Sequence, residues 1–129
     1  MSIVSPRSDV FMTPAEVTAF LAEPRTMVLS TIERDGWPHA AAMWFAIEGD
    51  EVLMWTYAKS QKAINLRRDP RCALHVEEGL AYNELRGVLI QGEGRLVEEF
   101  DAILDIGKAL YERYTLPAVG VPVDQGPLV

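Results

Sequence analysis

The sequence has a single cysteine and fewer basic than acidic residues. Cys72 stands alone among 129 residues, which excludes a disulfide bond within the chain and gives no support for an extracellular protein. Lysines and arginines number 12, against 19 aspartates and glutamates, so the formal net charge is -7. Since nucleic acids are bound through clustered basic side chains, this balance argues against a nucleic-acid partner.

Long apolar runs and the charged-then-apolar pattern of a leader are missing as well. We therefore expect a cytoplasmic protein with no membrane partner. The two histidines, His39 and His75, are far apart and lack neighbouring cysteines or spaced carboxylates, so no metal site is predicted. A nucleophile elbow, a P-loop and a paired-carboxylate arrangement are also absent, and no catalytic side chain is predicted.

The composition is that of one ordinary globular domain, with 49% hydrophobic and 24% charged residues. A domain of this size has difficulty covering its apolar surface internally, which favours a partner subunit or a ligand pocket. We expect a loose N-terminal segment over residues 1–11, a folded domain over 12–115 and a proline-rich tail over 116–129.

Local patterns predict a mainly β domain with a few helices. Thr13, Pro14 and Glu16 form a capping box that starts the first helix. In chain order we expect a helix over 14–22, strands over 27–32, 39–47 and 52–57, a helix over 60–68, strands over 71–77 and 86–97, and a helix over 100–114. The first three strands are expected to pair as a meander.

The segment from Thr56 to Lys62 joins a predicted strand to a predicted helix start and carries two lysines. Because a helix N-terminus holds about half a positive charge, cations in the first turn are disfavoured by roughly 0.3–1 kcal/mol. A bound phosphate would remove this conflict, with Lys59, Lys62, the Ser60 hydroxyl and free backbone N–H groups as its partners. A solvated basic turn without a ligand is the alternative, and the residues alone leave both open.

The second predicted strand, over residues 39–47, changes from small to large side chains at Met43 and Trp44, after Ala40, Ala41 and Ala42. Small side chains let a flat molecule approach the backbone, and the two large ones would border it. Core packing against the helices is the alternative explanation.

Five short motifs follow one another over about residues 12–115. They are Thr31 with Asp35-Gly36-Trp37-Pro38-His39, then Met43-Trp44-Phe45, then Trp55-Thr56, then the run from Lys62 to Arg71, and Gly92-Glu93-Gly94. In this order they resemble the pyridoxamine 5'-phosphate oxidase-like flavin-binding split barrels, and within them the deazaflavin (coenzyme F-420)-dependent reductase branch. The Lys-x-x-Asn-Leu-Arg-Arg-Asp-Pro-Arg run is the most specific of these motifs.

The resemblance implies a six-stranded antiparallel split β-barrel, homodimeric, with two cofactor sites at the subunit interface. The cofactor would be coenzyme F-420 (a deazaflavin) or FMN, which share a phosphate-bearing ribityl chain. Lys62 would meet the phosphate with help from Lys59 and Ser60, and Thr56 would lie near the ribityl chain. The ring would lie against Ala41, Ala42, Met43 and Trp44, with Tyr82 closing the site from the partner subunit.

The implied activity is hydride transfer between the cofactor and a small conjugated substrate, which needs no side-chain nucleophile. No arginine or histidine follows Tyr114, so we do not expect oxidation of pyridoxamine phosphate itself. A basic groove for the longer acidic tail would favour the deazaflavin, and Arg67, Arg68 and Arg71 are its candidates. An FMN-dependent oxidoreductase, a non-catalytic flavin, deazaflavin or haem binding protein, and a ligand-free structural dimer remain the alternatives.

Overall fold

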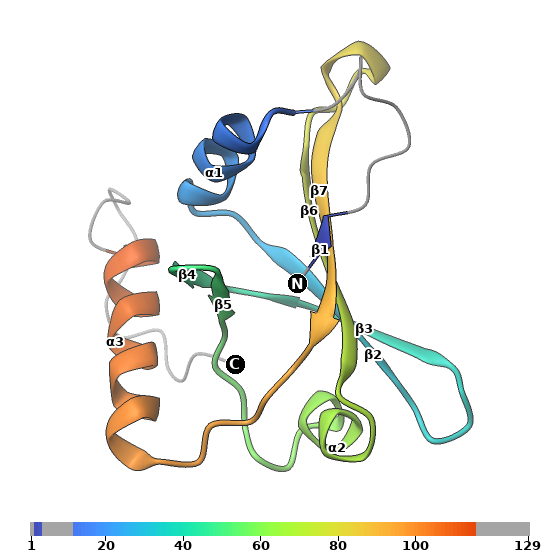
Figure 1. Ribbon diagram of the computed structural model, residues 1–129, viewed down its shortest axis with the longest axis vertical. Coiled ribbons are helices and arrows are strands. Elements are labelled where there is room, and N and C mark those ends of the chain that lie inside the picture. The colour runs from blue at the N-terminus through green and yellow to red at the C-terminus, as the bar shows by residue number, and fades with distance from the viewer. Residues whose placement is uncertain (1, 4–11, 116–129) are drawn as a thin grey trace.

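The computed structural model describes residues 2–3 and 12–115, and in this part the chain is mainly β with three α-helices (Figure 1). The predicted N-terminal segment and C-terminal tail lie outside the described residues, apart from Ser2–Ile3. The elements are β1 (Ser2–Ile3), α1 (Pro14–Ala22), β2 (Met27–Ile32), β3 (Pro38–Met43), β4 (Ala46–Glu48), β5 (Glu51–Leu53), α2 (Gln61–Arg68), β6 (Arg71–Glu78), the 3-10 turn η2 (Tyr82–Glu84), β7 (Arg86–Glu93) and α3 (Phe100–Thr115).

Five strands form one antiparallel sheet in the order β1-β7-β6-β2-β3, and β4 pairs with β5 in a separate two-stranded sheet. Side chains alternate between the two faces of the larger sheet, as strand geometry requires. One face is apolar and buried, and we call it the inner face. The expected mainly β, antiparallel fold is confirmed.

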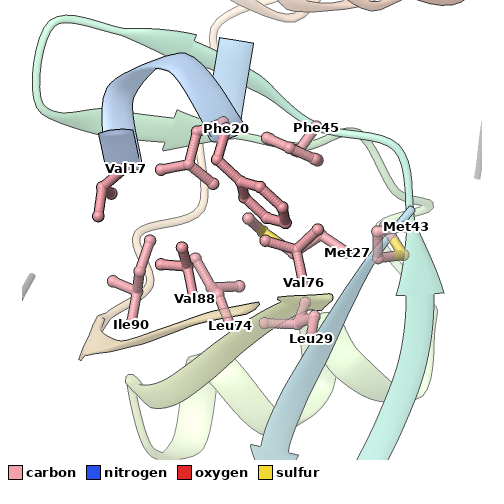
Figure 2. Packing of buried hydrophobic residues seen from close by; sticks show 11 residues of the cluster. Val17, Phe20, Met27, Leu29, Met43, Phe45, Leu74, Val76, Val88 and Ile90 are labelled. Atoms are coloured by element: carbon pink, nitrogen blue, oxygen red, sulfur yellow. The ribbon is translucent and has the colours of Figure 1, made fainter. Parts of the chain in front are cut away.

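The hydrophobic core lies between the inner face and α1 (Figure 2). Phe20 points from α1 toward the strands and is 2% exposed, while Met27 and Phe45 are fully buried. Burying each such side chain contributes roughly 1.5–3 kcal/mol relative to leaving it in water. The strands supply Met27, Leu29, Met43, Leu74, Val76, Val88 and Ile90 to this core.

The first helix forms where its capping residues predict it. Thr13 Oγ1 accepts the Glu16 N–H at 3.2 Å, and Glu16 Oε1 accepts the Thr13 N–H at 2.9 Å. This reciprocal pair satisfies two of the backbone donors that the start of a helix leaves free. The predicted capping box and the helix limits are therefore confirmed.

The predicted three-stranded meander is wrong, because the second run breaks after Met43. Phe45 is buried in the core, and its backbone N–H donates to the Tyr114 hydroxyl at 3.0 Å instead of a neighbouring strand. The chain resumes as β4, which pairs with β5 away from β2 and β3. The third predicted strand also ends early, at Leu53, and the fifth ends at Glu93.

The last helix, α3, lies on the side of β4 and β5 that faces away from the larger sheet (Figure 1). Arg113, near its end, donates to the carbonyl oxygens of Leu21 and Glu23 at 2.6 and 2.8 Å. A cation at this position satisfies carbonyl groups that the end of α1 leaves free. Leu110 of α3 is buried, whereas Phe100 at its start is 70% exposed. Within residues 2–3 and 12–115, no helix is long and apolar enough to cross a membrane.

Candidate functional site

A pocket of about 850 Å³ opens beside the core, between the inner face of the sheet, α2, the extended residues 50–56 and α3. This volume falls within the range of sites that enclose small organic molecules. Met43 and Leu74 line it from the sheet, and Ile103 and Ile106 line it from α3. Charged side chains line it as well: Lys62 and Arg67 from α2, and Asp50, Glu51, Glu93, Arg95 and Glu98 from the start of β5 and from the end of β7 onward.

The α2 wall carries Lys62, whose side chain is only 9% exposed. Among the described residues, no carboxylate lies within 4 Å of its ammonium group. Taking a charge out of water without a partner of opposite sign is costly. An anionic ligand in the pocket would supply that partner.

The start of α2 offers hydrogen-bond donors beside this lysine. Ser60 is the N-cap, and its Oγ accepts the Ala63 N–H at 3.2 Å and lies 3.0 Å from Thr56 Oγ1. One hydroxyl hydrogen joins Thr56 to Ser60, so the other hydroxyl hydrogen of the pair stays free to donate to a ligand. The backbone N–H groups of Gln61 and Lys62 have no partner within the helix.

The charge distribution along α2 is uneven. Its first turn has no acidic residue, and its last turn has Arg67 and Arg68. The two arginines suit the negative end of the helix dipole, whereas Lys62 in the first turn does not. The predicted conflict between lysine and helix dipole therefore remains at Lys62, with the side chain turned toward the pocket wall rather than into solvent.

Of the other residues predicted to contact a phosphate, some lie at the pocket and one does not. Thr56 lines the pocket together with Lys62, and Ser60 is hydrogen-bonded to Thr56. Lys59, in contrast, is exposed and does not line the pocket. Two lysines that are equivalent by local sequence thus have different surroundings, and the buried one is the stronger candidate.

The four residues predicted to border a ring do not share one surface. Met43 is buried and lines the pocket, and Ala41 packs against the core on the same face. Ala42 is exposed on the opposite face, as strand alternation requires. Trp44 stacks on Tyr114, with ring centroids 4.5 Å apart. A planar ligand in this pocket would contact Met43 but not Ala42.

Tyr82 lies in η2, where 93% of its surface is exposed. The connection between β6 and β7 that contains it is at the opposite end of the sheet from α2 (Figure 1). Tyr82 therefore does not reach the pocket of its own chain. Its contact with a ligand from a partner subunit stays a prediction.

Only one of the three arginines proposed for an acidic tail lines the pocket. Arg67 does so, and its Nη1 donates to the Ala58 carbonyl oxygen at 2.8 Å. Arg68 donates to the carbonyl oxygen of Ile32. Arg71 pairs with Asp69 at 2.7 Å, and this partner lowers the pKa of Asp69 to about 2.

Two further pocket residues were not predicted as site residues. Trp55 packs against α3 at Gly107, where an added methyl group would lie 3.6 Å from the indole ring. Cys72 is half-buried, and burial raises the pKa of its thiol, which favours the neutral form. Trp55 belongs to one of the motifs quoted from the sequence, although no role was assigned to it, whereas no local sequence signal marks Cys72. The described ranges contain no cluster of three or more histidines, cysteines or carboxylates that could hold a metal ion.

Comparisons with known proteins identify similar sequences and similar structures. A biliverdin reductase of Mycobacterium tuberculosis (strain CDC 1551 / Oshkosh), dependent on reduced coenzyme F-420, is 27% identical over 104 residues, which cover 79% of this chain and 72% of the reductase. The crystal structure of a conserved hypothetical protein from Mycobacterium tuberculosis is 44% identical, with a TM-score of 0.82, covering 91% of this chain and 73% of that one. A solved F-420 reductase is 26% identical, with a TM-score of 0.56, covering 71% of this chain and 74% of that one.

The pattern of one family extends over nearly the whole described domain. It is the family described as pyridoxamine 5'-phosphate oxidase, and it matches residues 13–127. The match includes the sheet apart from β1, the pocket and the start of α2. The chain therefore belongs to the pyridoxamine 5'-phosphate oxidase family and has its split-barrel fold, as the order of the sequence motifs indicated.

Proposed function

We propose that the pocket binds the phosphate-bearing ribityl chain of a flavin-type cofactor and that the protein is a cytoplasmic oxidoreductase. The observation that carries this proposal is Lys62, a residue only 9% exposed, which lines a pocket of about 850 Å³ and has no carboxylate within 4 Å of its ammonium group in the described part of the chain. A phosphate there would form an ion pair with the Lys62 ammonium. It would also accept hydrogen bonds from a Thr56 or Ser60 hydroxyl and from the free N–H groups of α2.

The similarity to an F-420-dependent biliverdin reductase and to an F-420 reductase makes the deazaflavin our first candidate and FMN the second. Either cofactor supplies hydride transfer at its ring when bound. The protein's own part is to bind and orient it: Lys62 and the hydroxyl pair hold the polar end. The apolar walls at Met43 and Ile106 exclude water from the remainder. Hydride transfer to a small conjugated acceptor needs no nucleophilic side chain.

We also propose that the protein is a homodimer. The outer face of the larger sheet presents small or apolar side chains such as Ala40, Ala42 and Leu89, and none of α1, α2 and α3 covers it (Figure 1). A second copy would bury this surface.

Light scattering should give twice the chain mass. Ala42→Glu should lower that mass, while Ala15→Glu on the exposed side of α1 should not; a wild-type monomer contradicts this proposal.

The decisive experiment is a titration of purified protein with FMN and, separately, with coenzyme F-420, followed by cofactor fluorescence. We expect saturable binding of one of them. Lys62→Met keeps the buried aliphatic stem but removes the charge, and it should weaken binding at least about tenfold, or about 1.4 kcal/mol. Lys59→Met is the matched control, since Lys59 is exposed outside the pocket.

Absence of binding by the intact protein, or equal effects of the two lysine substitutions, would contradict the proposed site. Turnover is tested next, by mixing the reduced cofactor with a conjugated acceptor. Biliverdin is the first acceptor to assay, because a relative's name mentions it. Oxidation of the bound cofactor by such an acceptor would support the enzyme, whereas binding without oxidation by any conjugated acceptor would favour a carrier.

A further inference from the structure

Asn65 and Thr31 form a wholly buried polar contact between α2 and β2. Asn65 is 0% exposed and Thr31 is 1% exposed, and Asn65 Nδ2 donates to Thr31 Oγ1 at 3.0 Å. The two residues are 34 positions apart, so the bond joins the helix to the inner face of the sheet. It is a side-chain link between two elements rather than part of a local turn.

The polar atoms of Asn65 are well satisfied. Its Oδ1 accepts from Gln61 Nε2 at 2.8 Å and from Arg68 Nη2 at 3.4 Å. Both donors belong to α2, so the amide group is fixed by its own helix as well as by β2. A buried amide whose partners are all present holds one orientation, because rotation would leave polar groups without hydrogen bonds.

Asparagine is a poor choice for this position if only helix stability matters. It has lower helix propensity than alanine or leucine, and a buried apolar side chain would pack without needing any hydrogen bond. An apolar contact, however, does not specify direction. A hydrogen bond of 3.0 Å between Asn65 and Thr31 fixes how far α2 is rotated about its own axis.

That rotation determines where Lys62 points. Lys62 and Asn65 are three residues apart in α2, so their side chains lie on the same side of the helix. A rotation of α2 that broke the Asn65–Thr31 bond would move the Lys62 side chain relative to the pocket wall as well. The exposed Lys59 precedes the helix and is not held in this way.

We infer that Asn65, held by Thr31, is a positioning residue that keeps the Lys62 ammonium directed into the pocket to receive a phosphate. This inference rests on the proposed function. It adds that phosphate recognition depends on a residue that does not touch the ligand. It also assigns to the Asn of the Lys-x-x-Asn run a role distinct from stabilising the fold.

The test compares the cofactor that the wild-type protein binds with its dephosphorylated form, riboflavin for FMN or the corresponding deazaflavin. The double variant Thr31→Val/Asn65→Leu replaces the buried pair by apolar side chains and so keeps the region packed. We expect about tenfold weaker binding of the phosphorylated form and unchanged binding of the dephosphorylated form. Thr31→Ser, which keeps the hydroxyl, should bind both forms as the wild type does.

A second measurement adds Lys62→Met to the double variant. Because Asn65 is inferred to act through Lys62, the combined loss should equal that of Lys62→Met alone. Ile90→Val, in the core on β7 and outside the pocket, controls for a general loss of stability. Equal weakening of both ligand forms, no weakening, or fully additive losses would overturn the inference. A wild-type protein that binds neither phosphorylated cofactor would overturn the proposed function first, and the inference with it.

Discussion

The hydroxyl of Tyr114, in the last turn of α3, is hydrogen-bonded to Phe45, where the predicted second strand is interrupted. The hydroxyl accepts the Phe45 N–H at 3.0 Å and lies 2.6 Å from the Arg25 carbonyl oxygen, to which it donates. Its ring stacks on Trp44 with the two planes 1° apart. One side chain therefore fixes the point where the chain leaves the larger sheet and enters the smaller one.

Tyr114→Phe should destabilise the protein by about 1–3 kcal/mol, because it leaves part-buried backbone groups without partners while keeping the aromatic stack. Urea unfolding measures the change. Tyr111→Phe is the matched control, since the described structure shows no hydrogen bond from the Tyr111 hydroxyl, and it should change stability little. Equal effects of the two substitutions would show that the hydroxyl contributes nothing.

Gly79→Ala should be more destabilising than Gly36→Ala. Both glycines have positive φ, +99° and +88°. An alanine at either position would therefore cost roughly 1–2 kcal/mol of stability, because its side chain is strained in the left-handed backbone conformation. A methyl group on Gly79 would also lie less than 3 Å from the backbone of Glu84, whereas at Gly36 nothing lies within 4 Å. Thermal unfolding of the two variants gives the comparison, and a larger loss at Gly36 would contradict it.

The Asp69–Arg71 pair should stabilise the folded protein at neutral pH and lose this effect at acidic pH. Hydrogen bonds from Arg71 lower the pKa of Asp69 from 3.8 to about 2, so the contribution is present above 3.8 and is lost as the pH falls toward 2. The stability difference between the wild type and Asp69→Asn should therefore shrink over that interval. Unfolding curves at several pH values measure it, and a difference that stays constant would show that the pair does not affect folding.

Arg67→Ala should weaken binding of coenzyme F-420 more than binding of FMN. Arg67 lines the pocket, and the deazaflavin has the longer acidic tail that a second cation would favour. Arg71→Ala is the control, because Arg71 is paired with Asp69 outside the pocket. Parallel fluorescence titrations measure both ligands. An equal effect of Arg67→Ala on the two cofactors would exclude a role in holding the tail.

Local sequence signals predicted the elements whose limits depend on neighbouring residues. Thr13 and Glu16 defined the start of α1, and Ser60 and Asp69 flank α2 at its two ends as expected. The break at Phe45 could not be predicted in this way, because its hydrogen-bond partner Tyr114 is 69 positions away. Tertiary contacts therefore decided where the second strand ends.

The candidate site was also predictable only in part from local sequence. The charge conflict at the start of α2 singled out two lysines, but only packing shows that Lys62 is buried at the pocket and Lys59 is not. On the same helix, the apolar Ile64 is 44% exposed, whereas the polar Asn65 is fully buried. Hydrophobicity alone does not single out Asn65, because its buried partner, Thr31, is itself polar.

The three tryptophans have different surroundings, so the fluorescence of one of them, Trp55, can report on the pocket. Trp37 is 70% exposed, Trp44 is covered by Tyr114, and Trp55 lines the pocket against α3. A soluble uncharged quencher should reduce the emission of Trp37 most, because Trp37 is the most exposed of the three. The remaining indole emission would then fall by energy transfer when a yellow cofactor enters, so occupancy can be followed in the unlabelled protein.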